Sequence, residues 1–174
     1  MIQARTSSRS IFAAIAVTLV VGLAPTTPAQ SGAPADVGTW TLNIPKSMSA
    51  SADGGPTLVA TAIRIEAAGA GVKCTIDLLD IEDGAQSLFY RLEFSGQYDG
   101  RDNTVTGSRL FGDVVALTRV DAHTTKSVFR QGPTVTVTMT SVVFSDGNTM
   151  TVTSTVPDAK GTPVTMSVAI YDKQ

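Results

Sequence analysis

The stretch "TVTVTMTSVVFSDGNTMTVTSTV", Thr134 to Val156, contains two runs of alternating residues separated by a short polar turn. In the second run Met150, Val152 and Val156 alternate with threonines. Because successive side chains of a strand point to opposite faces, this period of two predicts two strands. Asp146-Gly147 lies between them, and glycine accepts the positive φ that right-twisted hairpin turns need. The stretch therefore predicts an antiparallel β-hairpin.

The same pattern continues in both directions from this hairpin. Runs with period two recur between turn residues: "TWTLNI", "TLVATAIRIEA", "VKCTIDLLDI", "QSLFYRLEFSGQY", "TVTG", "DVVALTRV", "TTKSVFR" and "PVTMSVAIYDK". Two further Asp-Gly pairs, Asp83-Gly84 and Asp99-Gly100, predict hairpin turns. A meander of this size must close or leave bare strand edges. We therefore predict an all-β fold, a single antiparallel up-and-down β-barrel of about eight to ten strands, with closure near 104–112 left open.

The two faces of the predicted strands differ in chemistry. In "TWTLNI" the residues Trp40, Leu42 and Ile44 share one face. Threonine suits an exposed pleated face, because it is β-branched and still wettable. We therefore expect the aliphatic residues to point inward and the threonines outward. In the last run this places Val164, Met166, Val168 and Ile170 inside, and Thr165 and Ser167 outside.

The first 29 residues have the parts of a cleavable export signal. Two arginines precede the apolar run from Ile11 to Ala24, and Thr27 and Ala29 supply small residues before the expected cut. The apolar run is shorter than the roughly 20 residues that a membrane span needs. We predict a signal peptide over 1–29, a flexible leader over 30–36 and one β-barrel domain over 37–174. The expected location is secreted or periplasmic.

Charge and composition limit the partners. The predicted signal carries two arginines and no acids, so its removal takes the net charge of −2 to −4. That balance disfavours nucleic acid and anionic membrane surfaces, which attract basic patches. No apolar band for lipid is found on the predicted outer face, so we expect no membrane insertion after signal cleavage. We expect a monomer.

Residues that could carry chemistry are few. The single cysteine, Cys74, lies in phase with apolar residues, which favours a buried thiol over a catalytic or dimer-forming one. The single histidine, His123, lies in the turn "VDAHTTK". One His and one Cys cannot assemble an ordinary zinc or copper site. The acidic residues of "IDLLDIEDG" lack the calcium-loop spacing and favour a solvated hairpin tip. We predict no enzyme activity, no metal and no cofactor.

The segment "VGTWTLN" is similar to known families. "GTW", Gly38 to Trp40, resembles the Gly-x-Trp signature of the lipocalins, and the wider stretch resembles the first strand of fatty-acid-binding proteins, as "AIYDKQ" resembles their last. Over nearly the whole mature chain, "GTW.LN..KS", "YDG.D..VTG", "LTRVDA.T", "DGNTMTVTS" and "YDKQ" resemble uncharacterised secreted lipocalin-like proteins of soil bacteria. No activity carries over from that group.

The lipocalin resemblance implies a role for Trp40. It would cap the closed end of the barrel, beneath a basic side chain from a late strand, and Arg119 and Arg130 are the candidates. Simple core filling is the alternative for this residue. Fatty-acid-binding proteins hold the ligand carboxylate with Arg-x-Tyr, but here Ala169-Ile170-Tyr171 lacks the arginine. Tyr171 alone could donate one hydrogen bond, with an inward Arg64, Arg91 or Arg119 as a substitute.

Two functions remain open from the sequence. One is a carrier whose barrel binds a small hydrophobic or amphipathic ligand; the other is a structural or protein-interaction module of the cell envelope with a solid core. An apolar cavity above about 300 Å³ distinguishes them. The predicted ligand-binding residues are Ile63, Ile76, Leu78, Tyr90, Leu92, Phe94, Leu117, Arg119, Phe129, Met139, Met166 and Tyr171, with Val59, Val137, Val152 and Val168 as further lining and Gly38 and Trp40 as the structural motif.

Overall fold

The computed structural model describes residues 34–49, 57–82 and 85–174. These residues form twelve strands and one 3₁₀ helix. Their bounds are β1 Gly38–Leu42, η1 Ile44–Lys46, β2 Met48–Ser49, β3 Thr57–Ala68, β4 Gly71–Glu82, β5 Ala85–Gly96, β6 Asp99–Thr104, β7 Thr106–Gly107, β8 Val114–Arg119, β9 Thr124–Gln131, β10 Thr134–Val143, β11 Thr149–Pro157 and β12 Pro163–Lys173. No helix within these ranges is long and apolar enough to cross a membrane.

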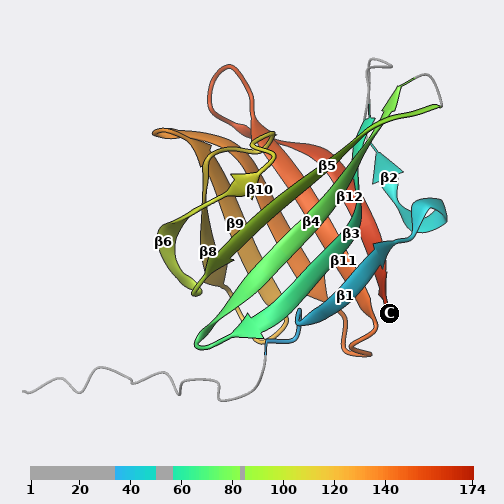
Figure 1. Ribbon diagram of the computed structural model, residues 1–174, viewed down its shortest axis with the longest axis vertical. Coiled ribbons are helices and arrows are strands. Elements are labelled where there is room, and N and C mark those ends of the chain that lie inside the picture. The colour runs from blue at the N-terminus through green and yellow to red at the C-terminus, as the bar shows by residue number, and fades with distance from the viewer. Residues whose placement is uncertain (1–33, 50–56, 83–84) are drawn as a thin grey trace, which may run out of the picture.

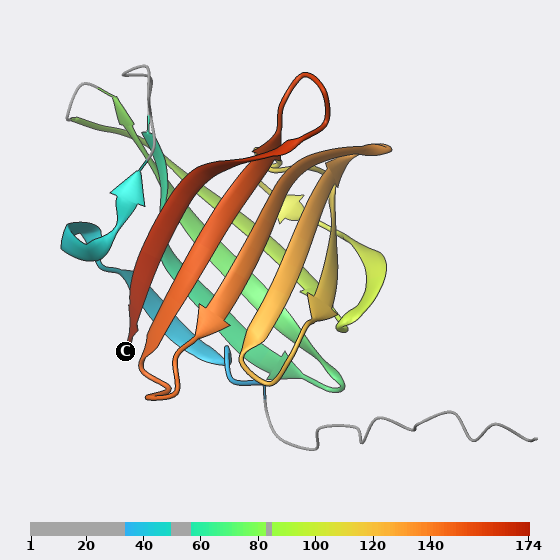
Figure 2. The ribbon, with the colours of Figure 1, turned by 180° about the vertical axis from the view of Figure 1, so that it is seen from behind.

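The strands wrap into one barrel of antiparallel neighbours (Figure 1 and Figure 2). The order around the sheet is β6-β8-β9-β10-β11-β12-β1-β3-β4-β5-β7, with β2 pairing beside β12. Strand β1 pairs with β12, so that Trp40 lies opposite Lys173 and the two ends of the barrel domain meet. The predicted fold, an all-β single antiparallel up-and-down barrel, is confirmed.

The barrel nearly closes through one segment that pairs on both sides. Strand β6 pairs with β8, β7 pairs with β5, and only Val105 separates β6 from β7. The Val105 side chain is buried, and its backbone N–H donates to the Asp113 carbonyl. The segment from β6 to β7 is therefore the seam of the barrel, in the region whose closure the sequence left open.

The Asp-Gly pairs do not all form the predicted turns. At Asp146-Gly147 the β10–β11 turn is confirmed, and the Asp146 carboxylate accepts from the backbone N–H groups of Asn148 and Thr149. Asp99-Gly100 instead lies within β6 at an irregularity against β8, so the hairpin turn predicted there is wrong. Asp83-Gly84 lies outside the described residues. The unpredicted β6 and the two-residue β2 raise the strand number above the predicted eight to ten.

The predicted alternation is confirmed on β11. Met150 and Val152 are buried in the core, and Val156 packs against it. The intervening threonines are more exposed. Ser154 continues the inward series and is also buried. On β11 the apolar residues therefore point into the core and the threonines point outward.

Strand β12 has the opposite phase over most of its length. Ala169 pairs with Val152 and Tyr171 pairs with Met150, so both face the interior. Val168 and Ile170, between and beside them, therefore face outward. The prediction that Val168 and Ile170 point inward is wrong.

A β-bulge at Met166 explains this reversal. Ser167 pairs with Ser154 and Thr165 pairs with Thr155, which leaves Met166 without a partner on β11. Met166 is 36% exposed. An extra residue in a strand exchanges the inward and outward faces beyond it. Val164, before the bulge, is therefore inward, whereas Val168 and Ile170, after it, face outward. The bulge therefore takes Met166 out of the regular pairing with β11, and its inward position stays a prediction.

Strand β1 ends earlier than predicted. Asn43 leaves the strand and its side chain accepts from the Lys46 N–H, which starts the short helix η1. Ile44 lies in that helix and is exposed, so its predicted place on the face of Trp40 and Leu42 is wrong. The helix positions β2 against β12. The rest of the predicted long connection, 50–56, lies outside the described residues.

Candidate binding site in the barrel interior

One end of the barrel is closed by Trp40 and the segment before it. The Trp40 side chain is fully buried, and its indole Nε1 donates to the Asp36 carbonyl at 2.8 Å. Ala35 and Val37 pack against the core from the same segment. We call Ala35, Asp36, Val37 and Trp40 the floor. Residues 35 and 36, which the sequence pattern places in the leader, are thus part of this packing.

A basic side chain lies over Trp40, but it is neither of the two candidates. Lys173 places its Nζ 5.1 Å from the centroid of the indole, a contact worth about 1 kcal/mol. Arg130 bonds to Asp102, and Arg119 lies over Tyr98 at 4.5 Å, so both candidate assignments are wrong. The sequence feature that could have identified Lys173 is its place in the last strand, because the last strand lies beside the first in a closed meander.

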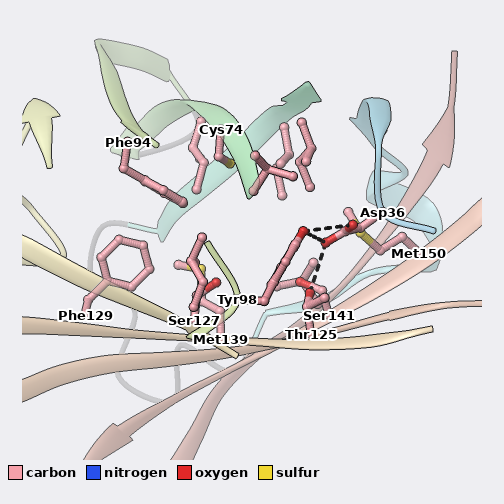
Figure 3. Close-up of a pocket in the computed structure, with 16 residues that line it drawn as sticks. Asp36, Cys74, Phe94, Tyr98, Thr125, Ser127, Phe129, Met139, Ser141 and Met150 are labelled. Carbon is pink, nitrogen blue, oxygen red and sulfur yellow. Dashed lines mark hydrogen bonds between the residues drawn. The ribbon is translucent and has the colours of Figure 1, made fainter. Parts of the chain in front are cut away.

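The floor includes a buried acid, Asp36, whose carboxylate faces the barrel interior. Asp36 is 4% exposed, and its carboxylate accepts from the Tyr98 hydroxyl at 3.0 and 3.1 Å and from Thr125 Oγ1 at 3.2 Å (Figure 3). Burial, and after it the charge of Asp36, raises the pKa of Tyr98, while Arg119 opposes the rise. The Tyr98 hydroxyl therefore remains a protonated donor at neutral pH.

Above this cluster the interior has two chemically different walls. The wall from β3 to β5 is apolar; its buried residues are Ile63, Ile65, Val72, Cys74, Ile76, Leu78, Leu92 and Phe94. The wall from β9 to β12 carries inward hydroxyl groups among its apolar residues. They belong to Thr125, Ser127, Ser141, Ser154 and Ser167. We call the first the apolar wall and the second the hydroxyl wall.

Ser154 is the most buried member of the hydroxyl wall. It is 6% exposed and lies between Met139 and Ser167 in the ladder. Its Oγ has no hydrogen-bond partner among the described residues. A buried hydroxyl left unpaired costs about 1–3 kcal/mol, so such groups normally meet water or a ligand. The position indicates a polar contact point inside the barrel.

The described residues enclose a small cavity in the floor half of the barrel. Its volume is about 40 Å³, and its lining includes Asp36, Tyr98, Thr125, Ser127 and Ser141 beside apolar side chains (Figure 3). This space holds a few water molecules and is far below the size of an organic ligand. Any larger ligand must therefore lie toward the other end of the barrel.

Inward residues at the end opposite the floor are more exposed than those near the floor. Val164 faces inward opposite Val156, yet it is 49% exposed. Tyr90 pairs with the buried Leu78 and packs against the core, but is itself only half-buried. Trp40 and Met150 near the floor, in contrast, are inaccessible. We call the half-exposed inward residues Tyr90, Val156, Val164 and Ser167 the mouth.

Most predicted ligand-binding residues lie together inside the barrel. The buried ones are Ile63, Ile76, Leu78, Leu92, Phe94, Leu117, Phe129, Met139 and Tyr171, and Tyr90 packs against them. Arg119 pairs with Thr125 on the inward face at the floor. Met166 is separated from this group by the bulge. Val137 and Val152 are core residues, whereas the side chain of Val59 lies outside the described part of the chain.

The other predicted arginines lie outside the barrel. Arg91 is exposed and forms two hydrogen bonds with Asp77, at 2.7 and 3.0 Å. Arg64 is exposed on the same outer face, beside Thr75 on β4. Neither therefore replaces the arginine of the Arg-x-Tyr pair, whose position is occupied here by Ala169.

Tyr171 is inward but already engaged. Its hydroxyl donates to the Ala60 carbonyl of β3 at 2.9 Å. Burial raises the pKa of Tyr171. The bond joins β12 to β3 at the level where β1 ends, so this hydroxyl holds the wall together and is occupied. The prediction that it donates to a ligand is not supported by this geometry.

The single cysteine and the single histidine have different surroundings. Cys74 is buried on the apolar wall, as predicted, and burial raises the pKa of its thiol. A thiol with a raised pKa is a poor nucleophile. His123 is exposed in the turn between β8 and β9, where its backbone N–H donates to Asp121.

Sequence reasoning misses the polar residues of the interior. The pattern places Asp36 in a leader and Tyr98 at the end of a strand. Ser154 stands in an alternating series whose inward phase is fixed by Met150 and Val152, so the sequence does carry its signal. No such signal exists for Asp36, because its burial depends on the barrel that closes over it.

No protein-family model, no curated protein and no solved structure matches the chain.

Proposed function

We propose that the protein is an extracytoplasmic, lipocalin-like binding protein for a small hydrophobic or amphipathic molecule, without enzymatic activity of its own. The observation that carries this proposal is the difference between the two ends of the barrel. The floor is closed by Trp40, whereas inward residues such as Val164 are half exposed at the mouth. Concave, mainly apolar sites with a few polar groups are typical of small-molecule binding.

Export from the cytoplasm is part of the proposal and rests on the sequence of residues 1–29. Expression of the full chain in a bacterial host, followed by N-terminal sequencing of the exported form, tests it. Processing before Gln30 supports export, and retention of the intact chain in the cytoplasm contradicts it.

The second candidate is a solid-cored module that acts through its outer surface. The observation in its favour is the small size of the enclosed cavity, about 40 Å³. Under this alternative the interior takes up only water, and the hydroxyl wall is hydrated.

Binding of the neutral dye Nile red distinguishes the two functions. A carrier raises the dye's fluorescence saturably, and Ser167→Phe at the mouth should weaken binding at least about tenfold. Val168→Phe is the matched control, because Val168 is the next residue along β12 and faces outward. Absence of saturable binding, or equal effects of both variants, would favour the solid-cored module. Native mass spectrometry of protein from its own host would reveal a co-purifying ligand.

A further inference from the structure

The two walls of the barrel interior are unequal in hydrogen-bonding capacity. Among its described side chains, the apolar wall offers aliphatic and aromatic groups and the Cys74 thiol, with the Tyr90 hydroxyl at its mouth end. The hydroxyl wall presents Ser127, Met139, Ser154 and Ser167 in one row across β9 to β12. A molecule between the walls would have an apolar side and a side that meets hydroxyl groups.

Among the side chains that the structure describes, the charged groups inside the barrel lie at its floor. Both oxygens of Asp36 accept from Tyr98, and one of them also from Thr125. The guanidinium of Arg119 lies over the same Tyr98 ring. Among the described residues, the row that contains Ser154 has no charged member. A charged head group beside it would be desolvated without a counter-ion, which is strongly unfavourable.

Resting on the proposed binding function, we infer that the ligand is an uncharged amphipathic molecule whose hydroxyl or carbonyl group bonds to Ser154. Ser154 is only 6% exposed, faces inward and has no side-chain partner among the described residues. Its hydroxyl is both donor and acceptor, so it matches a neutral alcohol or carbonyl group. Fatty-acid anions and organic cations are the disfavoured classes.

Three probes with the same alkyl chain and different head groups test this inference. They are 1-dodecanol, used below its solubility limit, and dodecanoate and dodecyltrimethylammonium, used below their critical micelle concentrations, each added to displace Nile red. We expect 1-dodecanol to bind at least about tenfold more tightly than either charged compound. Equal or tighter binding of dodecanoate would overturn the inference while leaving the binding function intact. If Nile red and all three compounds fail to bind, the proposed function itself is wrong.

Variants then assign the contact to Ser154. Ser154→Ala should weaken 1-dodecanol binding about fivefold and leave Nile red binding within about twofold of the original. Thr153→Ala is the matched control, because it removes a neighbouring hydroxyl that faces outward on the same strand. Equal losses of 1-dodecanol binding in both variants, or no loss in Ser154→Ala, would contradict the assignment. The head-group series on the unaltered protein provides an independent test should a variant fold poorly.

Discussion

Trp40 makes three contacts that a smaller side chain cannot combine. The indole fills the floor, its Nε1 donates to the Asp36 carbonyl, and its face receives the Lys173 ammonium. The glycine before Thr39 belongs to the same arrangement, because a Cβ on Gly38 would lie 2.5 Å from Lys173 Cε. The Gly-x-Trp motif thus makes room for the lysine that covers the tryptophan.

Replacing Trp40 by alanine should lower the free energy of unfolding by about 3–5 kcal/mol, because a cavity forms and the Asp36 carbonyl loses its donor. Urea unfolding measures this change. Phe89→Ala is the control, since Phe89 is an exposed aromatic residue and should change stability by less than about 1 kcal/mol. A loss below about 1 kcal/mol for Trp40→Ala would remove its role as the floor.

Tyr98 and Tyr171 should make the protein sensitive to alkali. Burial raises the pKa of both above the ordinary value of about 10. Above that pH the unfolded chain releases phenolic protons that the folded chain retains, so stability is complete below about pH 10 and falls as the pH rises beyond it. Urea unfolding across this range, with phenolate absorbance, measures the effect. The double variant Tyr98→Phe, Tyr171→Phe should show a smaller decline, and an unchanged decline would contradict the explanation.

At the scale of the strand, the local pattern predicts where a strand lies more reliably than which of its residues face inward. Alternation identifies β11 and its buried side correctly, because the inward residues Met150, Val152 and Ser154 each pair with one residue on both neighbouring strands. On β12 the same reasoning fails at Met166, because a bulge is set by the register with β11 and leaves no mark in the period of a single strand. The hairpin turn predicted at Asp99-Gly100 is wrong for a similar reason, since a glycine with positive φ occurs in bulges as well as in turns.

Two methionine substitutions test the bulge. Met150→Ala should cost about 2–5 kcal/mol, because Met150 is fully buried opposite Tyr171. Met166→Ala should cost less than about 1 kcal/mol, because Met166 is partly exposed and unpaired on β11. Denaturant midpoints at equal m-values provide the comparison. Similar losses in the two variants would support the inward position that the sequence alone predicts for Met166.

At the scale of the whole molecule, the sequence predicts a barrel but not how it closes. Closed meanders follow from the number of hairpins and the need to cover edges. The seam depends on Val105, the single residue between β6, which pairs with β8, and β7, which pairs with β5. It also depends on Gly107, whose φ is +77°. Likewise, the apolar lining can be predicted from alternation, whereas the Asp36 cluster joins segments 62 and 89 residues apart in the chain. The pattern of a single strand contains no information on contacts between residues so far apart in the chain.

Gly107→Ala should open the seam. A Cβ at Gly107 would lie 2.4 Å from the Arg91 carbonyl oxygen, which also accepts from the Ser108 N–H. Gly132→Ala is the control, because Gly132 also has a positive φ but a Cβ there would meet nothing within 4 Å. We expect Gly107→Ala to lose at least about 1 kcal/mol more than the control, and amide exchange at Ser108 to accelerate. Equal losses would show that β7 does not hold the seam.

The pairing of β1 with β12 has a consequence for the order of folding. Each hairpin can form from neighbouring residues, but the floor needs Trp40 and Lys173, which lie at opposite ends of the barrel domain. Contacts between such distant residues form late, because a long loop must be ordered first. We therefore expect the only tryptophan of the chain to be fully buried late, so that its fluorescence during refolding should report the closure of the barrel rather than the formation of its hairpins.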